Sequence, residues 1–156
     1  MTEVSSIKRI DDVDPNQFEV GEDHVLKAVH AIYHVTKVIT SAAAATAVEL
    51  LPNSKVPAGK KAYLINFIAR VNGTTVWGTT ATVKIQDKSA SAVDFVTMAV
   101  AALTSQARVV PGSSNTTLED AFSKGSGGGD GKGLQVKGDA NGTGSDLYVT
   151  ATIVVK

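Results

Sequence analysis

Short segments with the composition of β strands, separated by turn signals, constrain the fold of this chain more than any other feature. β-branched and aromatic residues gather in these segments, whereas Gly, Pro, Asn and Asp lie between them. Long helical segments do not alternate with the strands, as a parallel α/β fold requires. The pattern predicts an all-β fold of about seven to nine strands, arranged as a β-sandwich or a jelly-roll-like body.

The clearest expected strand is AYLINFIARV, at residues 62–71. Asn72-Gly73 follows it, and this pair favours a type I′ turn because both central residues need a positive φ. This order predicts a hairpin in which residues 74–77 return as the partner strand. Apolar and polar residues alternate, as in half-buried strands, at 79–86 and 147–155. Shorter strands are expected at 48–51, 108–110 and 134–137.

Two segments fit both a helix and a strand. Residues 25–40 carry apolar residues at helical spacing, but the β-branched density of HVTKVIT favours a strand from about residue 31 onward. Residues 93–103 are apolar almost throughout, and the neighbouring strand signals favour a strand there too. A short helix is expected within 117–124, with Thr117 as its N-cap. The glycine-rich stretch 125–133 is expected to be a flexible surface loop.

The distribution of charge separates an extended N-terminal arm, residues 1–30, from a β-sandwich body, residues 31–156. The chain has no net charge, but its first thirty residues hold seven acidic and three basic side chains. This arm is too apolar for a simple linker, so we expect it to dock either on its own body or on a partner chain. The apolar residues expected to make that contact are Val4, Ile7, Ile10, Val13, Phe18 and Val20.

Composition argues against several classes of function. Cysteine is absent, so the chain has no disulfide, thiolate metal site or thiol nucleophile. Charged residues make up 19% of a chain without net charge, which argues against a general nucleic-acid binder. No run of eighteen apolar residues occurs, so no membrane span is expected. Acidic residues stand where a signal peptide needs an apolar stretch, so synthesis in the cytoplasm is expected.

No motif indicates a catalytic or cofactor-binding site. In the glycine-rich stretch, Lys132 is followed by glycine rather than by the Ser or Thr that a phosphate-binding loop needs. Asp130 lacks the alternating aspartates and the final glutamate of a calcium loop. His30 and His34 have no third metal ligand at a fixed spacing. We therefore expect no enzyme, no cofactor and no metal, although the sequence alone does not exclude carboxylates that pair in space.

Residues 46–156 resemble the head decoration, or cement, proteins of tailed bacteriophages. The stretches that carry the resemblance are VELLPNSKVPAGKKAYLINFIARVNGTTVWGTTATVKIQD, VDFVTMAVAALTSQA and GKGLQVKGDANGTGSDLYVTATIVVK. The resemblance implies a β-sandwich body, often trimeric, on the outside of the capsid, where it ties neighbouring subunits together. The implied partners are the major capsid protein and further copies of this chain, and the implied location is the exterior of the virion.

The arm falls outside this resemblance, and its role is a separate hypothesis. We expect residues 1–30 to clamp the capsid, while the body forms a homotrimer through its strand faces. The competing hypothesis is a recognition module, such as the receptor- or glycan-binding head of a phage fibre or adhesin. Trp77, the one tryptophan, is expected in the core or in a subunit interface rather than in a sugar site.

Overall fold

The computed structural model divides into two compact units, Met1–Ala31 and Ile32–Lys156. In the first unit, β1 (Phe18–Val20) pairs antiparallel with β2 (Leu26–Ala28). The residues that the structure describes are 18–20, 26–28, 30–73, 75, 77, 82–100, 103 and 107–156.

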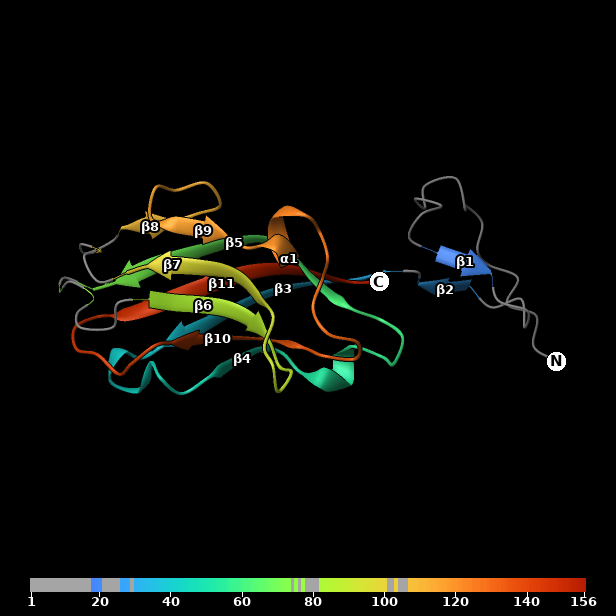
Figure 1. The fold of residues 1–156 in the computed structure, drawn as a ribbon, viewed down its shortest axis with the longest axis horizontal. Coiled ribbons are helices and arrows are strands. Elements are labelled where there is room, and N and C mark those ends of the chain that lie inside the picture. The colour runs from blue at the N-terminus through green and yellow to red at the C-terminus, as the bar shows by residue number, and fades with distance from the viewer. Residues whose placement is uncertain are drawn as a thin grey trace, which may run out of the picture. The chain divides into compact units, whose positions relative to one another are not determined.

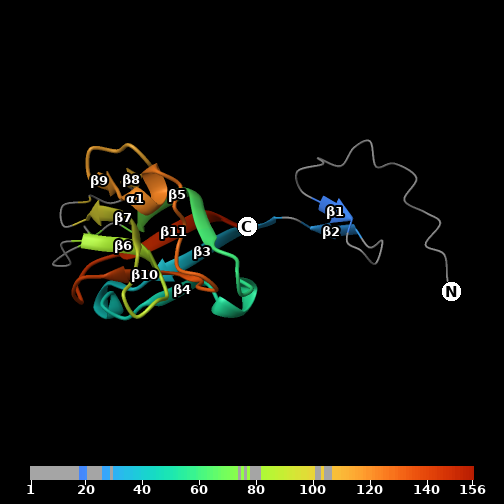
Figure 2. The same cartoon turned by 45° about the vertical axis from the view of Figure 1, so that its right-hand side comes forward.

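The body is an all-β sandwich of two antiparallel sheets, which confirms the predicted fold class (Figures 1 and 2). The four-stranded sheet consists, in spatial order, of β3 (Ala31–Ile39), β11 (Asp146–Val155), β5 (Ala62–Asn72) and β8 (Arg108–Val109). The five-stranded sheet consists of β4 (Val48–Leu51), β10 (Leu134–Gly138), β6 (Thr82–Asp87), β7 (Asp94–Ala99) and β9 (Thr116–Leu118). Short 3-10 turns occur at Ser41–Ala43 and Asn53–Lys55.

The core lies between the sheets and follows the period of two that strands impose. Along β11 every second residue is buried, from Leu147 to Val155, and β6 alternates in the same way. The largest fully buried side chains are Trp77, Phe67 and Phe95, so Trp77 belongs to the core of the body. The alternation of 79–86 and 147–155 therefore predicted which side of each described strand faces inward.

The predicted hairpin between 62–71 and 74–77, of which residues 74 and 76 lie outside the described residues, is wrong for the pairing of the first strand. β5 is a strand, but its neighbours are β11 on one side and β8 on the other. Near its end, Val71 is paired with Leu147, and its N–H donates to the carbonyl of Ala107 at 3.2 Å. Both edges of β5 are thus occupied by strands from distant parts of the sequence. Gly73, with φ of 133°, also lies far from the left-handed value of about 57°.

The two ambiguous segments are strands where the structure describes them. β3 begins at Ala31, as the density of β-branched residues in HVTKVIT predicted, and β7 occupies Asp94–Ala99. β7 pairs with β6 on one side and with β9 on the other, so it is a central strand. Phe95, Val96 and Met98 are fully buried, but Thr97 is half-buried and Ala99 is exposed, so the outer side of β7 is only partly covered.

The short helix begins later than predicted. α1 spans Asp120–Ser123, and its N-cap is Glu119 rather than Thr117. Thr117 lies in β9, paired with Thr97 of β7, and the Glu119 N–H donates to the carbonyl of Phe95 at 3.0 Å. Pairing with β7 therefore holds the chain extended for two residues beyond the predicted helix start.

The glycine-rich stretch 125–133 is bound to the body at several points, and the prediction of a merely flexible surface loop is wrong for its buried glycines. Gly127, Gly128 and Gly133 are buried. The Gly128 N–H donates to the carbonyl of Ala62 at 2.9 Å, and the Gly133 N–H donates to Oδ1 of Asn53 at 2.8 Å. Glycine is required at Gly127 in particular, because its φ is 71° and a Cβ would lie 2.8 Å from the Tyr63 ring.

Candidate interaction surface

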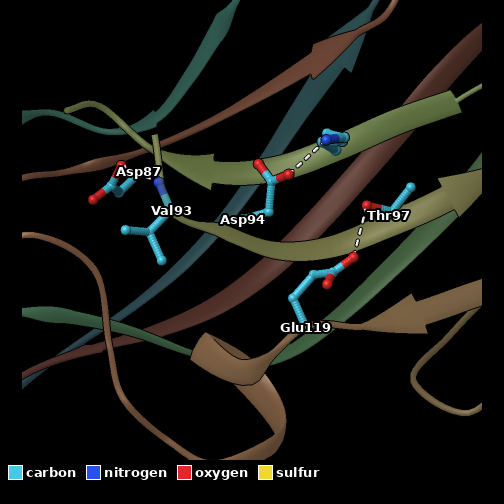
Figure 3. A network of polar contacts seen from close by, with 6 residues as sticks. Asp87, Val93, Asp94, Thr97 and Glu119 are labelled. Carbon is cyan, nitrogen blue, oxygen red and sulfur yellow. Dashed lines mark hydrogen bonds and ion pairs between the residues drawn. The ribbon is translucent and has the colours of Figure 1, made fainter. Parts of the chain in front are cut away.

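The outer face of the five-stranded sheet carries two carboxylates, Asp94 and Glu119, that have partners within the molecule. Lys84 Nζ lies 2.5 Å from Asp94 Oδ2, and Thr97 Oγ1 donates to Glu119 Oε1 at 3.1 Å (Figure 3). The hydrogen bond to Asp94 raises the pKa of Lys84; partial burial opposes this, and the charges of Asp94 and Glu119 add to it. A shallow concavity of about 260 Å³ on this side is lined by Lys84, Gln86, Lys137, Gly138 and Asp139.

The opposite side of the sandwich, which we call the four-stranded outer face, has a different chemistry. Hydrogen bonds across β3 and β11 define it: His34 Nδ1 with Thr152 Oγ1 at 3.1 Å, and Thr36 Oγ1 with Thr150 Oγ1 at 2.9 Å. The register of β5 against β11 adds the residues opposite these threonines. The face comprises Ile32, His34, Thr36, Val38, Tyr63, Asn66, Ile68, Arg70, Arg108, Tyr148, Thr150, Thr152 and Val154.

Exposed aliphatic side chains concentrate on this sheet. Ile32 is 52% exposed and Val38 38% on β3, while Ile68 is 42% exposed on β5. Ile65, at the bulge where β5 pairs with β11, is 52% exposed. Clustered exposed apolar residues on a folded surface are typical of protein-contact sites. The four-stranded outer face is therefore the candidate interaction surface of the body.

A concavity of about 280 Å³ lies within this face, and we call it the arginine notch. It is lined by Thr36, Ile68, Arg70, Arg108, Tyr148 and Thr150. Arg70 and Arg108 are direct partners in the register of β5 against β8. The Arg70 guanidinium carbon lies 5.9 Å from the centre of the Tyr148 ring, which is a cation–π distance. The notch thus brings two cations, one aromatic ring and two hydroxyls together.

One carboxylate, Asp87 at the end of β6, is fully buried. Its Oδ1 accepts hydrogen bonds from Ser89 Oγ at 2.6 Å, the Val93 N–H at 2.9 Å and the Ser89 N–H at 3.2 Å. Its Oδ2 accepts from the Gly129 N–H at 2.7 Å. These bonds join the β6–β7 turn to the glycine-rich loop, so Asp87 has a structural role.

Four of the arm residues predicted to contact a partner lie outside the described residues: Val4, Ile7, Ile10 and Val13. Phe18 and Val20 belong to β1, the strand paired with β2.

The residues considered for metal or phosphate chemistry do not come together where the structure describes them. In that part of the chain, no three His, Asp or Glu side chains are placed to hold a metal ion. His34 is bonded to Thr152, and Asp130 is exposed. No helix of the described residues is long and apolar enough to cross a membrane.

No local pattern in the sequence predicts the arginine notch. The alternation of 147–155 predicts the outward side of β11, but the register between β5 and β8 joins residues far apart in the chain. No family model matches the chain, and neither a curated protein nor a solved structure matches it.

Proposed function

We propose that this protein is a head decoration protein of a tailed bacteriophage, which binds the outside of the capsid and bridges major capsid protein subunits. The sequence resemblance of residues 46–156 suggests this role. The observation that carries the proposal is the contrast between the two outer faces of the body. The five-stranded outer face carries the internal ion pair Lys84–Asp94, whereas the four-stranded outer face exposes Ile32, Ile65 and Ile68 and contains the arginine notch.

A decoration protein of this kind needs surface contact rather than catalysis. Any molecule that binds the assembled shell and not its free subunits stabilises the shell by mass action. A sandwich with a fully buried core supplies a rigid body for this purpose, because its central strands are paired along most of their length. The contact is repeated at every lattice site, so each copy can bind weakly and still stabilise the whole shell.

We propose that β3 supplies the contact between copies in a homotrimer. β3 is the outermost strand of its sheet and, among the described strands, pairs with β11 alone. Its inward-facing residues Tyr33 and Val35 are only half-buried, and its outward-facing residues Ile32 and Val38 are exposed. An edge strand of nine residues with apolar side chains on each of its two sides is suited to contact with another chain.

Deletion of residues 1–23 is expected to leave a folded body that no longer decorates heads. The arm would supply main-chain and apolar contacts to the capsid, whereas the body forms a compact unit of its own. We expect at least about tenfold weaker binding in co-sedimentation with heads, while the circular dichroism spectrum and melting temperature of the body are retained.

A full-length variant tests whether binding depends on the apolar side chains of the arm or only on its length. Val4, Ile7, Ile10 and Val13 are replaced together by serine, which keeps all seven acidic residues of the arm. This variant should lose binding as the deletion does. Undiminished binding by both proteins would show that the arm does not hold the capsid.

A further inference from the structure

Arg70 and Arg108 stand directly opposite each other, and no carboxylate of the described residues is paired with either of them. They are register partners on neighbouring strands, and like charges in that position destabilise a sheet. Among the described residues, the ion pairs are Lys84–Asp94, Lys88–Glu49 and Lys124–Asp120, none of which includes an arginine. Asp146, the acidic residue of β11, belongs to none of these three ion pairs. The described part of the chain therefore holds two adjacent guanidinium groups and supplies neither with an ion-pair partner.

The two arginines lie in a concave part of the surface, beside side chains that are partly ordered. They line a concavity of about 280 Å³ instead of extending from a flat surface. Arg70 lies over the Tyr148 ring, which restricts the positions its guanidinium can take. Thr36 and Thr150 line the same concavity, and their hydroxyls bond to each other. An incoming group would thus meet partly ordered donors, which lowers the entropic cost of binding.

We infer that the arginine notch binds two neighbouring carboxylates of an extended, acidic peptide segment. A guanidinium group presents a planar fork of N–H donors that matches a carboxylate in a bidentate arrangement. Two forks side by side fit two carboxylates carried on one strand-like segment. The site is independent of the proposed function, but its assignment to an acidic segment of the major capsid protein rests on that function.

The chemistry around the notch favours a peptide over a nucleic acid or a sulfated glycan. Ile68 lines the notch, and exposed Ile65 lies three residues before it on the same strand. Such aliphatic groups would bury the apolar side chains of a peptide, but they have no partner on a polyanion. A nucleic acid also needs a broad field of positive charge, whereas this chain has no net charge.

The direct test uses a fluorescent eight-residue peptide of alternating glutamate and valine, measured by anisotropy at low salt. The wild-type protein should bind it, and Arg70→Gln with Arg108→Gln should weaken binding by at least about tenfold, because two charge-assisted contacts are lost. The control variant Lys55→Gln with Lys137→Gln removes two exposed positive charges outside the notch and should change binding by less than about twofold.

Three results would overturn the inference. The first is an equal loss of peptide affinity in the arginine and the lysine double variants. The second is that the wild-type protein does not bind the peptide. The third is that the notch binds a thymidine 12-mer in preference to the peptide. The arginine variant should melt within about 2 °C of the wild type, which shows that it is folded. Replacing both arginines by lysine should restore only part of the peptide affinity, since lysine lacks the planar fork of N–H donors.

Binding to heads separates this inference from the proposed function. If the arginine variant loses both the peptide and the heads, the notch is the capsid contact. If it loses the peptide but decorates heads like the wild type, the assignment to the capsid is wrong and the decoration function stands. If the wild type binds the peptide but never binds heads, the notch stands and the decoration function is wrong.

Discussion

Replacing Gly133 with alanine is expected to destabilise the body by about 3 kcal/mol and to lower its melting temperature by about 10 °C. A Cβ at Gly133 would overlap the carbonyl oxygen of Leu51 and lie 2.8 Å from the carbonyl carbon of Pro52. These are backbone atoms at the end of β4, so no side-chain rotation can relieve the overlap. The chain entering β10 would have to move away from β4.

This movement would break more than one contact. The Gly133 N–H donates to Asn53 Oδ1, and the Gly133 carbonyl accepts from the Lys88 N–H at 3.0 Å. Displacement of Gly133 would therefore loosen the links from β10 to the β4 end and to the β6–β7 turn. Thermal unfolding followed by circular dichroism measures the effect.

Gly125→Ala is the matched control. Gly125 has a φ of 63° and nothing within 4 Å of a Cβ, so alanine there would cost only backbone strain of about 1 kcal/mol. The φ of Gly133 is not positive, so the loss of stability in Gly133→Ala would come from the overlap alone. Equal losses in the two variants would contradict the close approach of Gly133 to Leu51.

Replacing Asp87 with asparagine is expected to cost about 3 kcal/mol of unfolding free energy at pH 7, because a buried, charged hydrogen-bond acceptor is lost. Asp87 is the acceptor in all four of its hydrogen bonds. Asparagine would place an NH₂ group against at least one of those donors. The N–H groups of Val93 or Gly129 would then remain buried without an acceptor.

The effect of Asp87→Asn should depend on pH in a defined direction. Burial raises the pKa of Asp87, but hydrogen bonds from Ser89, Val93 and Gly129 outweigh this and hold the pKa below its ordinary value. A carboxylate with a lowered folded-state pKa stabilises the fold fully above its unfolded value of about 4. That stability is lost as the pH falls through the folded value.

Urea unfolding at pH 7, 4 and 3 measures this dependence. The difference in unfolding free energy between wild type and Asp87→Asn should stay constant above about pH 4 and shrink below it. Asp130→Asn changes an exposed carboxylate of the glycine-rich loop, and its unfolding free energy should equal that of the wild type at all three pH values. A difference between wild type and Asp87→Asn that does not change down to pH 3 would show that the charge of Asp87 is not the source of the stability.

Local sequence pattern predicted the strands well and their partners poorly. The alternation in 147–155 marked both the strand and its inward side, because a period of two is a property of the strand itself. The turn signal Asn72-Gly73 misled, since it reports only what the chain favours locally. Pairing of β5 with β11 and β8 depends on residues far away in the sequence.

The candidate site could be predicted only in part for the same reason. That Tyr148 and Thr150 face outward follows from the alternation, but the meeting of Arg70 with Arg108 follows from register between distant strands. Asp87 resembled an ordinary turn residue, and its burial depends on the glycine-rich loop packing over it through Gly128 and Gly129. Tertiary contacts of this kind leave no local signal.

Electron cryomicroscopy of heads mixed with the purified protein tests the central claim most directly. The claim is that this β-sandwich acts through contacts repeated over the capsid surface. We expect density for on the order of hundreds of copies on the outside of the shell, grouped in threes with β3 at each contact between copies. A few copies confined to one vertex or to the tail would indicate a receptor- or glycan-binding head of a fibre or adhesin, and heads without added density would contradict the account altogether.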